Sequence, residues 1–235
     1  MTEITYDTRI GYSKGVLTPL YWAVMKFEQL ALAVFRRGST FRYRGSDLRY
    51  VLSMYNRTWA NERCVELAIA YDALESAPGK RVLEVGNVLS WYGVTGHEVV
   101  DKYEQADGVR NIDILELGDE EKFDLIVSIS TLEHVGWDET PREPAKLLAA
   151  YERLVTALAP GGKLLVSVPV DWNAWLDDAL ANDKIPADRI DWLERTGRYC
   201  SWRECDKPTA LAKNFGSPYG NANALAILTG EGSDD

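Results

Sequence analysis

Short apolar runs of strand length alternate with stretches of helical spacing over the last two thirds of this chain. The runs predict five strands, at 81–85, 97–101, 109–115, 123–130 and 163–169. Strand and helix signals that alternate in this way are typical of βαβ units, whose strands form a parallel sheet. Apart from Glu84, the core of the first run is apolar, as in a strand buried on both faces. The pattern therefore predicts an α/β fold with a doubly wound, mostly parallel sheet.

The helix expected between the fourth and fifth strands is marked by apolar residues from Leu147 to Leu158, and Ala159 to Gly162 would end it. A further helix is expected around 187–195. Two more strands are expected at 199–204 and 222–228, where they would close the sheet as an antiparallel hairpin.

The region before the sheet, residues 1–77, is predicted to be mostly helical. The elements expected there are an arm at 1–16, a helix at 17–35, a polar link at 38–45, a helix capped by Ser46 or Asp47, and a helix at 61–74. Residues 78–230 would form the main domain, and 231–235 a polar tail. We expect the N-terminal region to close over the ligand site as a cap.

The apolar segment 17–35 is long enough to raise the question of a membrane span. Lys26, Glu28 and Gln29 lie in its middle, where insertion into a bilayer costs free energy, so we expect no span and no membrane contact. We expect this helix to pack on its own domain or on a second copy of the chain, as a homodimer. The alternative is an amphipathic helix that covers the active site, a partner subunit or a membrane surface.

Charge and cysteine content exclude some classes of function. A formal net charge of −10 over 235 residues argues against nucleic-acid binding, which requires a basic face, and favours a small-molecule or protein partner. Cys64, Cys200 and Cys205 lack metal-ligand spacing and only two histidines occur, so we predict no metal site. The odd number of cysteines and the polar start of the chain favour a cytoplasmic location without a signal peptide.

Polar residues gather where the predicted strands end. Glu84 and Gly86 belong to the first strand end, Asp101 to the second, Asp113 to the third and Ser128 to the fourth. Because the carboxyl ends of parallel strands meet at one crevice, we expect these residues to lie together. An acid about 15 residues beyond the first glycine is placed to accept the hydroxyls of a ribose. The set predicts a nucleoside-type ligand, although each acid alone could pair with a lysine, cap a helix or belong to a turn.

Three segments between residues 81 and 171 resemble the class I S-adenosylmethionine-dependent methyltransferases. They are LEVG, FDLIVSISTLEHV and LAPGGKLLVSVP, in this order. The resemblance implies a Rossmann-like sheet of seven strands whose last hairpin is reversed.

The same resemblance implies S-adenosyl-L-methionine as the cofactor. The residues implied to contact it are Glu84, Gly86 and Asn87 at the methionine part, Asp101 at the ribose, Asp113 and Ile114 at the adenine, and Ser128 and Ile129 at the inner wall.

The glycine loop departs from the family. Loops of the family carry two or three glycines, whereas here Gly86 is followed by Asn87, Val88, Leu89 and Ser90. We expect a loop of different shape or weaker binding. The loss harms a dinucleotide site more, because glycines there let the backbone approach a pyrophosphate, so it favours a cofactor without phosphates over NAD.

Methyl transfer from a sulfonium is an in-line displacement, which needs aligned reactants and, for a hydroxyl acceptor, a base. His134 is the candidate base, and Glu133 would orient it or accept the proton itself. The alternative is that both residues begin a helix and anchor the sheet. Aromatic side chains expected in the nearby loops could stack on a sugar or face the sulfonium; they are Trp91, Tyr92, Trp137, Trp172 and Trp175.

The sequence thus predicts a methyltransferase (EC 2.1.1 type) that acts on a small molecule, by O-methylation of a sugar or another secondary metabolite. One alternative is an N-methyltransferase, which needs no base if the amine arrives neutral. Another is a cofactor-binding or scaffold protein that kept the fold and lost catalysis. Glu62, Arg63 and Glu66 are the polar residues that stand out on the helix predicted at 61–74. Asn61, Glu62 and Arg63 would form a solvated face or an N-terminal cap, or this segment would also line the cofactor site.

Overall fold

The computed structural model describes residues 18–35 and 38–233, and the chain divides into one unit up to Ser39 and a second from Thr40 onward. In the first unit, α1 (Thr18–Phe35) is the helix predicted at 17–35. No helix among the described residues is long and apolar enough to cross a membrane. The arm predicted at 1–16 lies outside the described residues.

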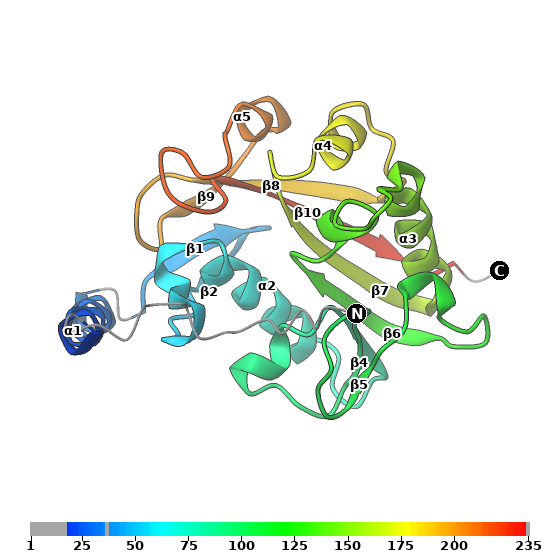
Figure 1. Ribbon diagram of the computed structural model, residues 1–235, viewed down its shortest axis with the longest axis horizontal. Coiled ribbons are helices and arrows are strands. Elements are labelled where there is room, and N and C mark those ends of the chain that lie inside the picture. Colours follow the sequence, from blue (N-terminus) through cyan, green and yellow to red (C-terminus); the bar gives the residue numbers. More distant parts are fainter. Residues whose placement is uncertain (1–17, 36–37, 234–235) are drawn as a thin grey trace. The chain divides into compact units, whose positions relative to one another are not determined.

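The second unit is built on an eight-stranded sheet with the order β5-β4-β3-β6-β7-β10-β8-β9 (Figure 1). Its strands are β3 (Val82–Val85), β4 (Glu98–Val100), β5 (Val109–Arg110), β6 (Phe123–Ile129), β7 (Leu158–Pro169), β8 (Arg189–Arg195), β9 (Trp202–Cys205) and β10 (Ala224–Glu231). The first five strands run parallel in the doubly wound order 3-2-1-4-5, and β10 runs antiparallel to both its neighbours. The predicted fold class is confirmed, with β9 added as an eighth strand at the edge.

The strands predicted at 199–204 and 222–228 exist, but the hairpin expected between them is wrong. β10 lies between β7 and β8 instead, and β9 pairs with β8. Ala224 to Leu228 are all buried, as an interior strand requires, whereas Arg203 and Glu204 of β9 are exposed, as an edge strand allows. Burial, which the sequence pattern alone does not give, decides the position of each strand.

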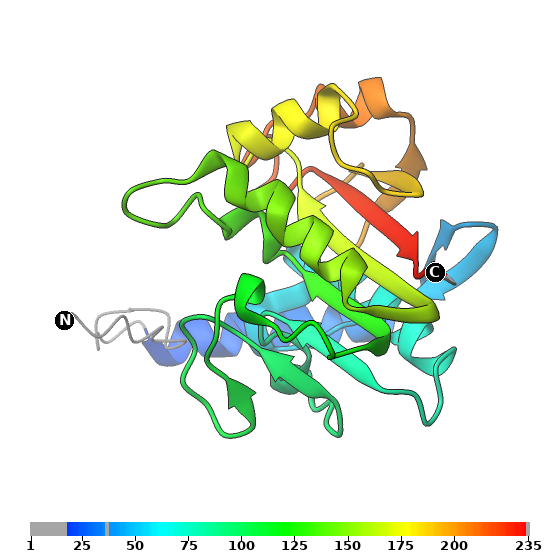
Figure 2. The ribbon, with the colours of Figure 1, turned by 90° about the vertical axis from the view of Figure 1, so that its right-hand side faces the viewer.

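Helices cover the two faces of the sheet unequally. They are α2 (Arg63–Glu75), α3 (Pro144–Thr156), α4 (Ala174–Ala181) and α5 (Lys207–Leu211). α2 and α3 lie on opposite faces (Figure 2). Leu147, Tyr151 and Leu154 of α3 join alternate residues of β7, such as Leu164 and Val166, in the main hydrophobic core.

The helix predicted at 187–195 is wrong, because this segment is the strand β8. Its buried stretch includes Asp191, Glu194 and Arg195. These charged residues sit inside the sheet with partners of their own, so the segment lacks a clean alternation of polar and apolar residues. The helix α4 was not predicted, although Asn173 caps it by accepting from the N–H groups of Trp175 and Leu176.

The connections at the carboxyl edge of the sheet are short. The chain after β3 forms only the 3₁₀ turn η2 (Leu89–Tyr92) before β4 begins. Similar turns are η1 (Tyr55–Ala60), η3 (Ile114–Glu116) and η4 (Leu132–His134). The third strand is also shorter than predicted, since β5 ends at Arg110. With so little helix there, side chains must hold these loops.

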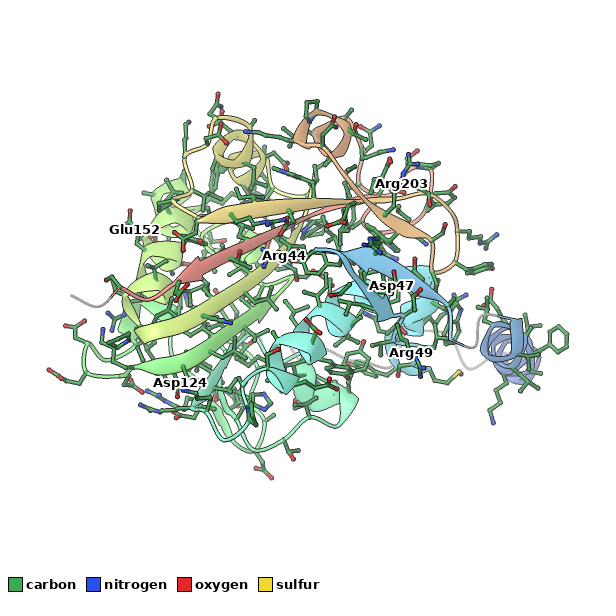
Figure 3. All side chains as sticks on the ribbon, turned by 180° about the vertical axis from the view of Figure 1, so that it is seen from behind. Arg44, Asp47, Arg49, Asp124, Glu152 and Arg203 are labelled. Atoms are coloured by element: carbon green, nitrogen blue, oxygen red, sulfur yellow. The ribbon has the colours of Figure 1, made fainter. Side chains whose placement is uncertain are left out.

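The polar link at 38–45 and the helix cap at Ser46 or Asp47 are wrong predictions. The segment is a hairpin of β1 (Thr40–Tyr43) and β2 (Ser46–Arg49), with a two-residue turn at Arg44 and Gly45, both at positive φ. Arg44 binds Asp191 of β8 and Thr229 of β10, which anchors the hairpin to the sheet (Figure 3).

The compact second unit therefore begins at Thr40 and includes α2, whose predicted range at 61–74 is confirmed within two residues. The role of the N-terminal region as a cap stays a prediction.

Candidate functional site

Glu84, at the carboxyl end of β3, shapes the loop that follows it. One carboxylate oxygen accepts the N–H groups of Val88 and Leu89, both at 2.7 Å. The other lies 2.8 Å from Nε2 of His97. The carboxylate is fully buried, so these partners offset the cost of its burial. Both oxygens therefore have partners within the protein. Glu84 stabilises the loop that would surround the methionine part of the cofactor and has no oxygen left to bind it.

Gly86 has a conformation and a contact that only glycine tolerates. Its φ is +85°, and a Cβ at this position would overlap the side chain of Thr131, which follows β6. The next residue, Asn87, donates from Nδ2 to Glu104 at 2.9 Å, and Glu104 also accepts from the indole of Trp91 at 3.2 Å. The loop after β3 is thus tied to the loops after β6 and β4.

Asp101 follows β4 and holds its own loop with only one of its two oxygens. Oδ1 accepts the N–H groups of Tyr103 and Glu104 at 2.8 and 2.7 Å. Among the described residues Oδ2 accepts no hydrogen bond, and the side chain is partly exposed. A carboxylate held rigidly with one free oxygen can accept a hydroxyl of a ligand.

Asp113 lies close to that edge, but its carboxylate is bound on all sides. Oδ1 accepts the N–H of Leu115, and Oδ2 lies 2.5 Å from Nζ of Lys146 and 3.0 Å from Nζ of Lys102. Burial opposes ionisation here, but the hydrogen bonds from the two lysines prevail and lower the pKa of Asp113. Ile114 is buried in the main core. In this arrangement Asp113 has no oxygen left for an adenine amino group.

Ser128 and Ile129 end the middle strand β6. Both are buried, and Ser128 Oγ has no hydrogen-bond partner in residues 18–35 and 38–233. Ser130, which follows them, has a φ of +42° and turns the chain out of the sheet. The predicted inner wall is thus an apolar strand end with one unsatisfied hydroxyl.

His134 forms a pair with an acid that the sequence analysis did not single out. Its Nδ1 lies 2.6 Å from Oδ2 of Asp138, four residues later. Trp172, in the loop after β7, contacts the imidazole edge-on, and Phe215 packs on Trp172 with ring centroids 4.9 Å apart. The imidazole is 42% exposed, and so is available to a ligand. The arrangement is a histidine oriented by a carboxylate beside a partly exposed aromatic surface.

Glu133 differs sharply from the histidine next to it, since only 1% of its surface is exposed. Within the described part of the chain its Oε2 has no hydrogen-bond partner, and its Oε1 lies 3.8 Å from Nε2 of His134. Burial raises the pKa of Glu133 well above its usual range. The position of the backbone is fixed, because the side chain of Asn173 donates to the Glu133 carbonyl at 2.6 Å.

The first turn of α2 lies beside Glu133 and was the open question of the sequence analysis. Glu66 is buried and accepts hydrogen bonds from the hydroxyls of Ser130 and Ser167, at 2.6 and 2.8 Å. Its other oxygen pairs with Arg63 at 3.0 Å. Glu66 therefore connects α2 with the ends of β6 and β7.

A cavity of about 450 Å³ lies elsewhere, at the amino-terminal edge of the sheet. Its lining includes Arg44, Asp72, Lys80, Asp124 and Lys163, and none of the predicted site residues. Ligands of open α/β sheets bind at the opposite, carboxyl edge. We therefore place the candidate site at the carboxyl edge, among the residues described above.

Asp138 and Glu104 were not predicted as site residues, because the sequence signals for them are weak. Asp138 follows His134 at a spacing of four, which brings two side chains together in any helical turn. Glu104 follows Asp101 at a spacing of three, which alone resembles a solvated pair. Both spacings are too common to identify a site without the fold.

No family model matches the chain, and no curated protein is found to be related to it. Solved structures are similar. The N-methyltransferase NodS from Bradyrhizobium japonicum is 16% identical, with 74% of this chain and 97% of that chain covered and a TM-score of 0.46. The 1,6-didemethyltoxoflavin-N1-methyltransferase from Burkholderia thailandensis is also 16% identical, with 95% and 94% covered and a TM-score of 0.44.

These TM-scores lie below 0.5, so the fold is argued from the sheet itself. Five parallel strands in doubly wound order are followed by an antiparallel strand inserted beside the fifth. This is the reversed arrangement that the resemblance in the sequence implies. The fold is that of the class I S-adenosylmethionine-dependent methyltransferases.

Proposed function

We propose that this protein is an S-adenosylmethionine-dependent methyltransferase that acts on a small molecule, by methylation of a hydroxyl of a sugar or another secondary metabolite. The observation that carries the proposal is the pair of His134 and Asp138 at the carboxyl edge of a sheet with the methyltransferase strand order. A partly exposed imidazole oriented by a carboxylate is suited to take a proton from a hydroxyl.

The residues at the carboxyl edge fit the cofactor in part. Asp101 offers a free oxygen to a ribose, and the unsatisfied Oε2 of Glu133 is a polar atom that a ligand could satisfy. Asp113 does not fit the role at the adenine that the resemblance implies, because two lysines bind it. Glu84, Gly86 and Asn87 would support the loop around the site, and Ser128 and Ile129 would form its inner wall, whereas Ile114 is buried in the main core.

The chemistry of the bound cofactor would be an electrophilic methyl group on a sulfonium. For an O-methylation, Nε2 of His134 accepts the hydroxyl proton while Asp138 keeps Nδ1 protonated and fixes the ring. Trp172 and Phe215 would hold a flat or sugar-like acceptor against the imidazole. The remaining work is alignment of the reacting groups, which can lower a barrier by about 7–11 kcal/mol.

An N-methyltransferase is the second candidate, and Glu133 is the observation that favours it. A buried carboxyl beside the proposed acceptor site can bind an amine without any base. The solved N-methyltransferases named above would be its relatives in chemistry. A cytoplasmic location and a homodimer through the helix at 17–35 stay predictions.

Transfer of a labelled methyl group separates these candidates. We would incubate the protein with methyl-labelled S-adenosylmethionine and panels of sugars, phenols and amines, and compare wild type with His134→Ala and Asp138→Asn. Labelled hydroxyl products that are lost in both variants would support O-methylation. Labelled amines that survive in both variants would support N-methylation, and binding of the cofactor without any transfer would support the scaffold alternative.

A further inference from the structure

Glu133 is a buried acid that lacks the partners such a group normally has. Nearly all buried side-chain oxygens are hydrogen-bonded, and an unsatisfied one usually marks strain, catalysis or a missing ligand. Glu133 Oε2 has no partner among the described residues. Glu84 shows the contrast, because hydrogen bonds reach both of its oxygens. Glu66 Oε2 also lacks a hydrogen bond among the described residues, but it is ion-paired with Arg63 at 3.0 Å, whereas Glu133 Oε2 has no such pair.

Charged groups from the start of α2 and from η4 face this carboxyl. Arg63, Glu66 and Glu62 approach it from α2, with Glu62 bound to the N–H of Ala222. On its own turn, His134 lies 3.8 Å from Oε1 and is itself paired with Asp138. Tyr92 of η2 faces the same arginine.

The one cation among these groups does not neutralise Glu133. Arg63 is ion-paired with Glu66, and the N–H of Ala222 is taken by Glu62. The cluster carries three carboxyls and one guanidinium, so the negative charge is in excess. An unpaired carboxylate in this place is costly, and burial keeps the pKa of Glu133 well above its usual range. Burial and the neighbouring carboxyls thus both favour the protonated form of Glu133 when no ligand is bound.

Resting on the proposed function, we propose that Glu133 recognises a positively charged nitrogen or sulfur of the bound nucleoside and gives up its proton as that group arrives. The proton leaves the carboxyl oxygen for water, and the carboxylate that remains pairs with the ammonium or sulfonium. No other bond breaks and no electrons are transferred. The cation supplies the partner that Oε2 lacks, and the net charge of the site is the same before and after binding.

Calorimetry can count this proton. We would titrate the whole chain at pH 6 with S-adenosylhomocysteine, S-adenosylmethionine and methylthioadenosine, each in cacodylate and in MES, whose ionisation enthalpies differ. The difference in apparent enthalpy between the buffers gives the protons released for each ligand bound. We expect about one proton with wild type and none with Glu133→Gln, whose affinity should fall roughly tenfold because a charge-assisted contact is lost.

The three ligands distinguish the source of the positive charge. Release with both S-adenosylhomocysteine and S-adenosylmethionine, but not with methylthioadenosine, assigns Glu133 to the amino-acid ammonium. Release with S-adenosylmethionine alone assigns it to the sulfonium. Binding without proton release, or equal release by Glu133→Gln, overturns the inference while the proposed function stands.

The wild-type titrations do not depend on any variant folding. Glu152→Gln is the matched control, because Glu152 lies on the exposed side of α3 (Figure 3) and should leave both affinity and proton release unchanged. If none of the three nucleosides binds to wild type, the proposed function itself fails, and the inference fails with it.

Discussion

The two halves of the carboxyl edge use their acids in opposite ways. At the ends of β3 and β5, Glu84 and Asp113 have partners for every oxygen, and these partners are loop N–H groups, a histidine and lysines. After β6, Glu133 is buried with an unsatisfied oxygen, and His134 is exposed and oriented. In the first half the acids therefore stabilise the loops, and none of their oxygens is left for a ligand. The second half contains polar atoms that lack a partner among the described residues, as expected of a place where ligands bind and react.

The largest expected effect tests what joins the two halves. Glu66→Ala removes the acceptor of Ser130 and Ser167 and leaves Arg63 buried without its partner. Breaking a buried ion pair in this way costs about 3–5 kcal/mol of unfolding free energy. Urea unfolding would measure it, with Glu152→Ala as the exposed control, which should change stability by no more than about 0.5 kcal/mol. A loss below about 1 kcal/mol would mean that Glu66 does not hold the ends of β6 and β7 together.

Next in size is the catalytic effect expected in the second half. His134→Ala should lower the methyl-transfer rate to a hydroxyl acceptor by about 10²–10⁴-fold, the usual contribution of a positioned base. Cofactor affinity should stay within about twofold, since His134 is a base for the acceptor. Asp138→Asn should show a smaller loss with the same pattern. Equal losses of rate and affinity would instead indicate a structural histidine.

A change in the first half should act on stability. Gly86→Ala places a side chain at positive φ and against Thr131, which we expect to cost about 2–4 kcal/mol of unfolding free energy from backbone strain and overpacking together. Thr131→Ala should relieve the overpacking part only, so the double variant should be more stable than Gly86→Ala alone. If Thr131→Ala gives no relief, the loops after β3 and β6 are not packed as described.

The smallest effect is a pH dependence. The folded pKa of Glu133 is raised above its ordinary value near 4.5, so between these two values the folded state holds more protons than the unfolded state. Its contribution to stability is full below pH 4.5 and declines as the pH rises. Wild type should therefore lose stability relative to Glu133→Gln between pH 5 and pH 7, by at most about 1.4 kcal/mol for each pH unit. A relative gain over this range would mean that Glu133 is ionised in the folded protein.

The sequence predicted the parallel half of the sheet well, for a physical reason. Strands buried on both faces are mostly apolar, and Val82 to Val85 and Phe123 to Ile129 follow this rule apart from Glu84, Asp124 and Ser128. β8 and the hairpin at 40–49 were missed, because their residues are held by distant charged partners. Asp191 of β8 binds Arg44 of the hairpin, 147 residues away, and no local pattern reveals such a pair.

Part of the candidate site could also be predicted from the sequence. Strand ends located Glu84, Asp101 and Asp113 at one edge, since the carboxyl ends of parallel strands meet there. Which of them keeps a free oxygen depends on lysines far away in the sequence, such as Lys146 for Asp113. For that reason Asp101 and Asp113 cannot be told apart from the sequence, whereas in the structure only Asp101 keeps a free oxygen.

Titration of two isosteric variants with a nucleoside tests the proposed cofactor. It also tests whether Asp101, and not Asp113, binds it. In Asp101→Asn, Oδ1 still accepts the N–H groups of Tyr103 and Glu104, but the free oxygen becomes an NH₂ that accepts no ribose hydroxyl. We predict that wild type binds S-adenosylhomocysteine, that Asp101→Asn binds it more weakly by about 1.5 kcal/mol, and that Asp113→Asn binds it as wild type does. No binding by wild type, or a loss in Asp113→Asn with none in Asp101→Asn, would contradict the account.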